Sequence, residues 1–137
     1  MATIDLTGGQ SAIPYDGLNK LYRIKNRLDF SQVNAAASDV VEAVQVKPNT
    51  HVKQVYVKLV AAEGSTATCT VGDSGHAAGL IATANLNATP GTITQNTISD
   101  TYANGCIYTA AADIALVPGN NLSHAIVDII VVCQDLN

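Results

Sequence analysis

The segment at residues 51–75 constrains the fold of this chain most, because its side chains alternate between apolar and polar over two successive stretches. In the first stretch the apolar positions are Val55, Val57 and Leu59, and in the second they are Ala67, Cys69 and Val71. A period of two is typical of a strand that buries one face. Gly64 stands between the stretches and can adopt positive φ, so the segment predicts a β-hairpin and an all-β domain.

Other stretches extend this pattern along the chain. Residues 40–46 (VVEAVQV), followed by a turn at Pro48, predict a second hairpin that shares the strand at residues 51–60. Residues 105–110 and 114–117 predict two short strands with Asp113 in the turn between them. The most apolar stretch, residues 125–134 (AIVDIIVVCQ), predicts a central strand covered on both faces.

About eight strands with frequent turn signals, and no clear helix, predict a single-domain β-sandwich, jelly-roll-like in preference to immunoglobulin-like. We expect this domain to span residues 21–137, after an extended N-terminal arm at residues 1–20 that is loosely attached and could lie on a neighbour.

The charge composition excludes some partners and suggests others. Only 13 % of the 137 residues are charged, against about 25 % in an average soluble domain, which fits either a surface covered by other subunits or a Ser/Thr/Asn-rich monomer surface. The net charge of −4 argues against nucleic acid as a partner. All seven basic residues lie between Lys20 and Lys58.

Three of these basic residues form a stripe. In the predicted strand at residues 21–30 (LYRIKNRLDF), Arg23, Lys25 and Arg27 occupy alternate positions and therefore one face. The stripe could be a solvated strand face, or it could dock on an acidic partner. Asp128 is the one carboxylate within the apolar stretch at residues 125–134, and we expect it to lie at an exposed edge or to pair with a basic residue across the sheet.

No motif predicts catalysis, a metal site or a cofactor. Residues 72–75 (GDSG), followed by His76, resemble the nucleophile motif of trypsin-like proteases, but the chain is too short for that fold, and we interpret them as a turn. The three cysteines lack zinc-site spacing with the histidines and are predicted to be buried free thiols made in a reducing cytosol. No segment predicts export or membrane insertion.

Several short motifs resemble small virion structural proteins of tailed bacteriophages. They are residues 28–31 (LDFS), 39–42 (DVVE), 48–50 (PNT), 52–57 (VKQVYV), 63–68 (EGSTAT), 71–73 (VGD) and 79–86 (GLIATANL). These motifs describe turns and strand alternation, so they specify the fold more than the task.

The resemblance implies a non-enzymatic jelly roll on a phage capsid, most specifically a head decoration (cement) protein. Such a protein would be made in the host cytoplasm, form a homotrimer, and bind the major capsid protein on the capsid exterior. Our candidates for capsid contact are, in the arm, Thr3, Ile4 and Asp5 and, in the stripe, Arg23, Lys25 and Arg27. A fibre, tail or host-recognition module remains an alternative, as does, more remotely, a small hydrolase.

Overall fold

The computed structural model describes residues 1–13, 21–97 and 100–136. These residues form ten strands and one short 3-10 helix, η1 (Thr7–Gly9). The strands are β1 (Thr3–Asp5), β2 (Leu21–Asp29), β3 (Val40–Val46), β4 (Thr50–Ala61), β5 (Thr68–Gly72), β6 (Ile81–Asn85), β7 (Ile93–Gln95), β8 (Cys106–Tyr108), β9 (Ala112–Pro118) and β10 (Ile126–Asp135). Within the described ranges no helix has the length and apolarity needed to span a membrane. The predicted all-β fold is confirmed.

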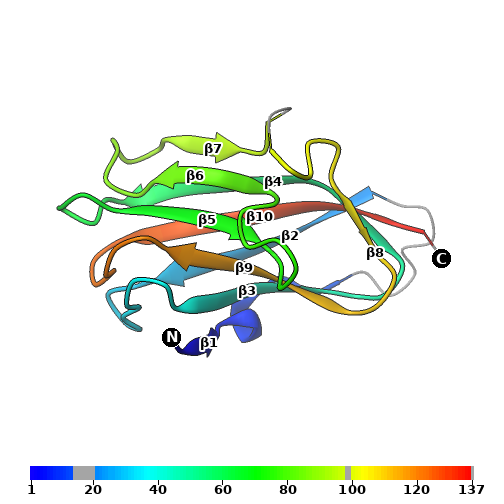
Figure 1. Cartoon of the computed structure of the whole chain (residues 1–137), viewed down its shortest axis with the longest axis horizontal. Helices are drawn as coiled ribbons and strands as arrows, with labels where there is room; N and C mark the ends of the chain where they lie inside the picture. The colour runs from blue at the N-terminus through cyan, green and yellow to red at the C-terminus, as the bar shows by residue number, and fades with distance from the viewer. Residues whose placement is uncertain (14–20, 98–99, 137) are drawn as a thin grey trace.

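Two five-stranded sheets pack face to face as a sandwich (Figure 1). Sheet A has the order β1-β3-β9-β5-β6, and sheet B has the order β2-β10-β4-β7, with β8 also paired to β4. From β2 to β5 the chain switches sheet at every strand, as in a jelly roll. The described residues form ten strands, where about eight were predicted. The ten include β1, which belongs to the predicted arm, and the short edge strand β7, which pairs with β4.

Both predicted hairpins at residues 40–75 are wrong. β4 lies in sheet B, whereas β3 before it and β5 after it lie in sheet A. Residues 51–75 therefore form an arch between the sheets, although Gly64 does adopt the expected positive φ of 92°. The turn predicted at Asp113 is wrong as well, since Asp113 lies inside β9 and β8 belongs to the other sheet. Alternation identifies the side of a strand that faces the core. It does not identify the sheet, because a strand in either of two facing sheets shows the same alternation.

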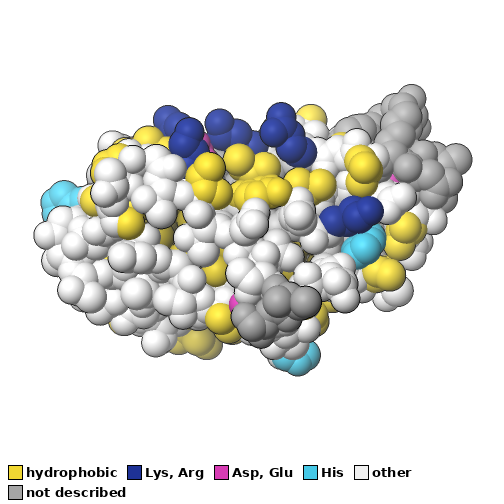
Figure 2. Space-filling view, turned by 90° about the horizontal axis from the view of Figure 1, so that it is seen from above, with side chains coloured by type: hydrophobic (Ala, Val, Ile, Leu, Met, Phe, Trp, Pro, Cys, Tyr) yellow, Lys and Arg dark blue, Asp and Glu magenta, His cyan; other side chains and the backbone are white. Residues whose placement is uncertain are grey.

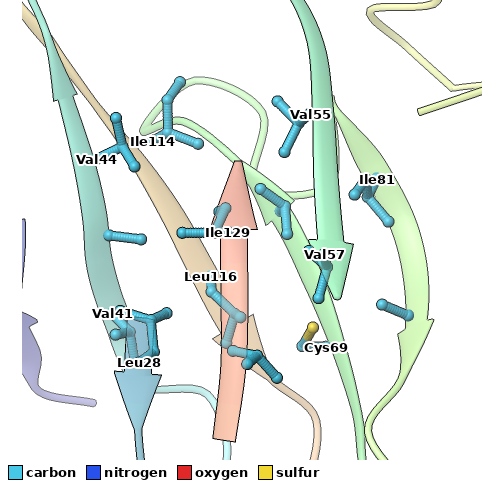
Figure 3. Packing of buried hydrophobic residues seen from close by; sticks show 14 of the residues in the cluster. Leu28, Val41, Val44, Val55, Val57, Cys69, Ile81, Ile114, Leu116 and Ile129 are labelled. Atoms are coloured by element: carbon cyan, nitrogen blue, oxygen red, sulfur yellow. The ribbon is translucent and has the colours of Figure 1, made fainter. Parts of the chain in front are cut away.

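An aliphatic core fills the space between the sheets (Figure 3). Leu28 and Ile129 enter it from sheet B, and Val41, Ile114 and Leu116 enter it from sheet A. All five side chains are fully buried. Burying a side chain of this size contributes about 1.5–3 kcal/mol. The core therefore holds the two sheets together without a large aromatic cluster.

β10 lies between β2 and β4 at the centre of sheet B, as its composition predicted. Its inner residues, such as Ile129 and Val131, are fully buried. Its outer residues Ile126, Ile130 and Val132 are only half-buried, because the described chain forms two layers and none lies over this side. The prediction that this strand is covered on both faces is therefore wrong for the isolated chain.

The described part of the arm lies on its own domain. β1 pairs in parallel with β3 at the edge of sheet A, and further along the Ser11 N–H donates to the Lys25 carbonyl at the edge of sheet B (2.8 Å). Between these points the buried side chain of Asn26 donates to the carbonyls of Leu6 (2.8 Å) and Ala43 (2.7 Å). The arm thus ties the two sheets together along one edge. Residues 14–20 lie outside the described part of the chain.

Asp39 fastens the start of the arm, because its carboxylate accepts the N–H groups of Ala2 and Ala36, each at 2.9 Å. We expect Asp39→Ala to release β1 and to speed hydrogen exchange at the Val40 and Leu6 amides about tenfold or more, since both donate to carbonyls across the β1–β3 contact. Asp29→Ala is the control, because Asp29 caps only its own loop at Ser31. Equal exchange in both variants would contradict this role.

Candidate protein interface

The six residues predicted from the sequence lie at one edge of the sandwich. Arg23, Lys25 and Arg27 are exposed on the outer side of β2, the edge strand of sheet B, and β1 lies at the corresponding edge of sheet A. In β1, Thr3 and Asp5 are exposed and Ile4 is half-buried. Asp5 and Arg27 line the same shallow groove. We call β1, the arm up to Ser11 and β2 the arm edge.

β10 places apolar side chains next to the basic stripe. Ile130 lies opposite Lys25 of β2 on one side and opposite Tyr56 of β4 on the other. Val132 occupies the equivalent position beside Arg23. The outer faces of β4 and β10 therefore carry a half-buried apolar surface, which we call the apolar panel. It consists of Tyr56, Ile126, Ile130 and Val132.

Lysines border the panel on its far side. Lys58 lies on the outer side of β4, and Lys53 lines a hollow with Val132. Figure 2 shows Lys and Arg side chains gathered along one side of the molecule beside a band of hydrophobic side chains. An apolar centre with a charged rim is the usual composition of a protein–protein interface.

Asp128 lies in the outward row of β10 and anchors part of the stripe. Arg27 donates to its two carboxylate oxygens from Nε (2.8 Å) and Nη2 (3.0 Å), and Lys25 Nζ lies 3.6 Å away. The hydrogen bonds from Arg27 hold the pKa of Asp128 below its ordinary value despite burial. The predicted pairing of Asp128 with a basic residue across the sheet is confirmed. Among the described residues no carboxylate lies within ion-pair distance of Arg23 or Lys58, although Lys58 is in register with Asp128, so the surface keeps an excess of positive charge.

The outer face of sheet A carries the opposite charge. Asp5 on β1 is in register with Glu42 on β3, and Asp113 lies on the next strand, β9. Burial and the neighbouring carboxylates raise the pKa of both Glu42 and Asp113. We call this surface the acidic face. It surrounds a hollow of about 760 Å³ whose lining includes Val40, Glu42, Asp113, Ala115 and Val117.

The GDSG segment is a turn, as predicted. Asp73 accepts the backbone N–H of His76 (2.9 Å) and the hydroxyl of Tyr108 (2.7 Å). His76 Nδ1 is hydrogen-bonded to the Tyr102 hydroxyl at 2.7 Å. A Ser-His-Asp triad requires a carboxylate at that nitrogen, so this arrangement fastens a loop and does not form a triad. Within the described ranges no group of His, Cys, Asp and Glu is placed to hold a metal ion.

The cysteines are free, and two of them match the prediction of buried thiols. Burial raises the pKa of Cys69 and of Cys133 to about 12, which keeps both thiols protonated and unreactive. Cys106 is half-buried, so for this residue the prediction of full burial is wrong.

Sequence reasoning found the stripe but missed the apolar panel. Ile126, Ile130 and Val132 are apolar on the outward side of a strand whose inward side is also apolar. That signal was present in the sequence and was interpreted as a central strand covered on both faces. In the structure, the same residues form a half-buried outer surface that no described part of the chain covers.

No protein-family model and no curated protein matches this sequence. Its fold is similar to chains in three solved structures. A chain of the capsid of Ralstonia phage GP4 matches with a TM-score of 0.71 and 14 % identity, over 98 % of both chains. A chain of the acid-stable capsid of Helicobacter pylori bacteriophage KHP30 matches with a TM-score of 0.64 and 14 % identity, over 85 % of this chain and 89 % of that one.

The third is a chain of the cyanophage Pam1 capsid asymmetric unit, with a TM-score of 0.62 and 15 % identity over 91 % of both chains. At these identities the likeness establishes a shared fold. The chain therefore has a β-sandwich fold that also occurs in phage capsid structures, in agreement with the resemblance found in its sequence motifs.

Proposed function

We propose that this chain is a non-enzymatic structural protein of a bacteriophage virion, and specifically a decoration protein on the outside of the head. One observation carries the proposal: its fold is shared, over nearly the whole length, with chains of phage capsid structures. The exposed stripe and apolar panel support it, because a protein with a docking task needs such surfaces.

In this proposal three copies associate and sit on the assembled shell, where each contacts the major capsid protein. The arm edge faces the shell, with Thr3, Ile4 and Asp5 from β1 and the stripe from β2. A protein that binds only the assembled shell lowers the free energy of that state. Three linked copies add their separate contacts, so weak individual contacts are sufficient.

The test is the binding of the double variant Arg23→Glu/Lys25→Glu to purified heads that lack this protein. We expect binding at least about tenfold weaker than that of the wild type, with a smaller dependence on salt. Arg27 is left in place because it satisfies the buried carboxylate of Asp128.

The matched control is Ala82→Glu/Thr83→Glu, which adds negative charge on exposed positions of β6, at the opposite edge of sheet A. This variant should bind as the wild type does. Undiminished binding of the stripe variant would exclude the stripe from the shell contact.

Copy number separates a decoration protein from a fibre or tail module. A decoration protein is expected in virions at a copy number comparable to that of the major capsid protein, which a stained gel of purified particles measures. The structure offers little support for glycan binding at Tyr102, because this aromatic residue hydrogen-bonds His76 and packs against Gly79. A few copies per particle would overturn the decoration role.

A further inference from the structure

We propose that the apolar panel of one copy packs on the acidic face of a second copy, so that copies of this chain join head to tail. This inference deepens the proposed homotrimer. It rests on that proposal only for the number of copies, three, after which the head-to-tail contacts close into a ring. It uses β4 and β10 of one copy and the outer sides of β3 and β9 of the next. The stripe on β2 borders the panel, and Thr3 and Asp5 of β1 border the acidic face, so both lie at the margin of the contact.

The panel has the composition of a contact surface that a partner covers. Ile130 and Val132 on the central strand and Tyr56 beside them are half-buried in the isolated chain. Half-buried apolar side chains on the outer face of the sheet, bordered by Lys53 and Lys58, match the apolar core and charged rim of a protein interface. The sequence of β10 has the same feature, since it is apolar on both sides as a strand covered on both faces would be.

The acidic face offers the complementary features. Its centre is built from small and β-branched side chains, Val40, Ala115 and Val117, which line the hollow between the acidic residues. The carboxylates of Glu42 and Asp113 receive no hydrogen bond from the described residues, whereas the carboxylates of Asp73 and Asp128 do. The raised pKa of each shows that its charged form lacks stabilisation within this chain. Lysine ammonium groups from a partner would stabilise these charged carboxylates.

The opposite charges on the two outer faces determine the kind of assembly. A symmetric contact would place like charges opposite each other, panel on panel or acidic face on acidic face, which is unfavourable. A head-to-tail contact pairs Lys53 and Lys58 of one copy with Glu42 and Asp113 of the next. Contacts between two different surfaces form rings when the rotation closes, and a trimer is such a ring.

Charge swaps test the contact by sedimentation velocity on the full chain at neutral pH and low salt. We expect the wild type to self-associate, and we expect Lys53→Glu/Lys58→Glu and Glu42→Lys/Asp113→Lys each to sediment as monomers. The quadruple variant carries all four substitutions, so the charges of the two surfaces are exchanged and remain opposite. It should regain the mass of the wild-type assembly. Circular dichroism melts verify that each variant is folded. If the Glu42→Lys/Asp113→Lys variant is not folded, the conservative pair Glu42→Gln/Asp113→Asn replaces it, and this pair is expected to weaken association about tenfold.

The outcomes separate this inference from the proposed function. A wild-type chain that stays monomeric at every concentration, or double variants that keep the mass of the wild type, would overturn the inference. A folded quadruple variant that fails to reassociate would overturn the pairing of these two faces. If the Lys53/Lys58 variant self-associates normally but no longer binds heads, the panel contacts the shell and the inference is wrong. If the swaps behave as expected but the wild type binds no phage head, only the proposed function fails.

Discussion

Replacing Glu63 with alanine is expected to lower the free energy of unfolding by about 3 kcal/mol or more. The Glu63 carboxylate is nearly inaccessible to solvent and accepts the backbone N–H groups of Ser123 (2.8 Å), His124 (2.9 Å) and Ala125 (2.7 Å). These residues form the turn that leads into β10. Without the carboxylate the three N–H groups lose their acceptor, and urea unfolding measures the resulting loss of stability.

The pH dependence of this effect follows from the pKa of Glu63. Burial would raise that pKa, but the hydrogen bonds from the three backbone N–H groups and from the Ser123 hydroxyl outweigh burial and hold the pKa below its ordinary value. The carboxylate therefore contributes stability that is fully present above the unfolded pKa, 4.5, and is lost as the pH falls through the folded pKa. We expect the difference in stability between the wild type and Glu63→Gln to shrink steadily below about pH 4.5.

The control is the same substitution at Glu42, a half-buried carboxylate whose pKa is raised by burial and by Asp113. A group with a raised pKa destabilises the folded chain when it is charged, so Glu42→Gln should leave the monomer equally or slightly more stable at neutral pH. Equal losses in the two variants would show that the acceptor role of Glu63 is not the reason for its effect.

Glu63 also shows where sequence reasoning reached its limit. The motif at residues 63–68 (EGSTAT) was interpreted as a turn, and Gly64 does adopt positive φ. The carboxylate of Glu63, however, accepts hydrogen bonds that tie the arch between β4 and β5 to a turn about sixty residues later in the chain. A contact over that separation leaves no signal in local alternation, because period-two patterns describe a single strand.

The same physics explains which parts of the fold were predictable. Alternation located the strands and their inner sides, and the apolar composition of residues 125–134 placed β10 at the centre of its sheet. Sheet membership was not predictable, because β4 and β5 present the same pattern whether they pair with each other or face each other across the core. Even so, the cost of burying an unpaired charge led to the prediction that Asp128 lies at an exposed edge or pairs with a basic residue across the sheet, and its pairing with Arg27 is the second of these.

Two adjacent isoleucines on β10 provide the sharpest test of the two sides of this strand. Ile129 points into the core and is fully buried, whereas Ile130 lies in the apolar panel on the outer side. We expect Ile129→Ala to cost about 3 kcal/mol of stability, the usual effect of a cavity in an aliphatic core. Ile130→Ala should cost less than about 1 kcal/mol in the monomer, because its side chain already contacts solvent. Urea unfolding at a concentration where the chain is monomeric measures both.

The ranking of the two variants by the size of their effect should reverse when self-association is measured. Ile129→Ala leaves the outer surface unchanged, so folded chains of this variant should associate as the wild type does, whereas Ile130→Ala removes a side chain from the centre of the proposed contact and should weaken association. The same residue type at neighbouring positions of one strand keeps composition and backbone constant, so the comparison isolates the direction of the side chain. If Ile130→Ala instead destabilised the monomer as much as Ile129→Ala, some other part of the same chain would have to cover this face, and the panel could not be the surface on which a second copy docks.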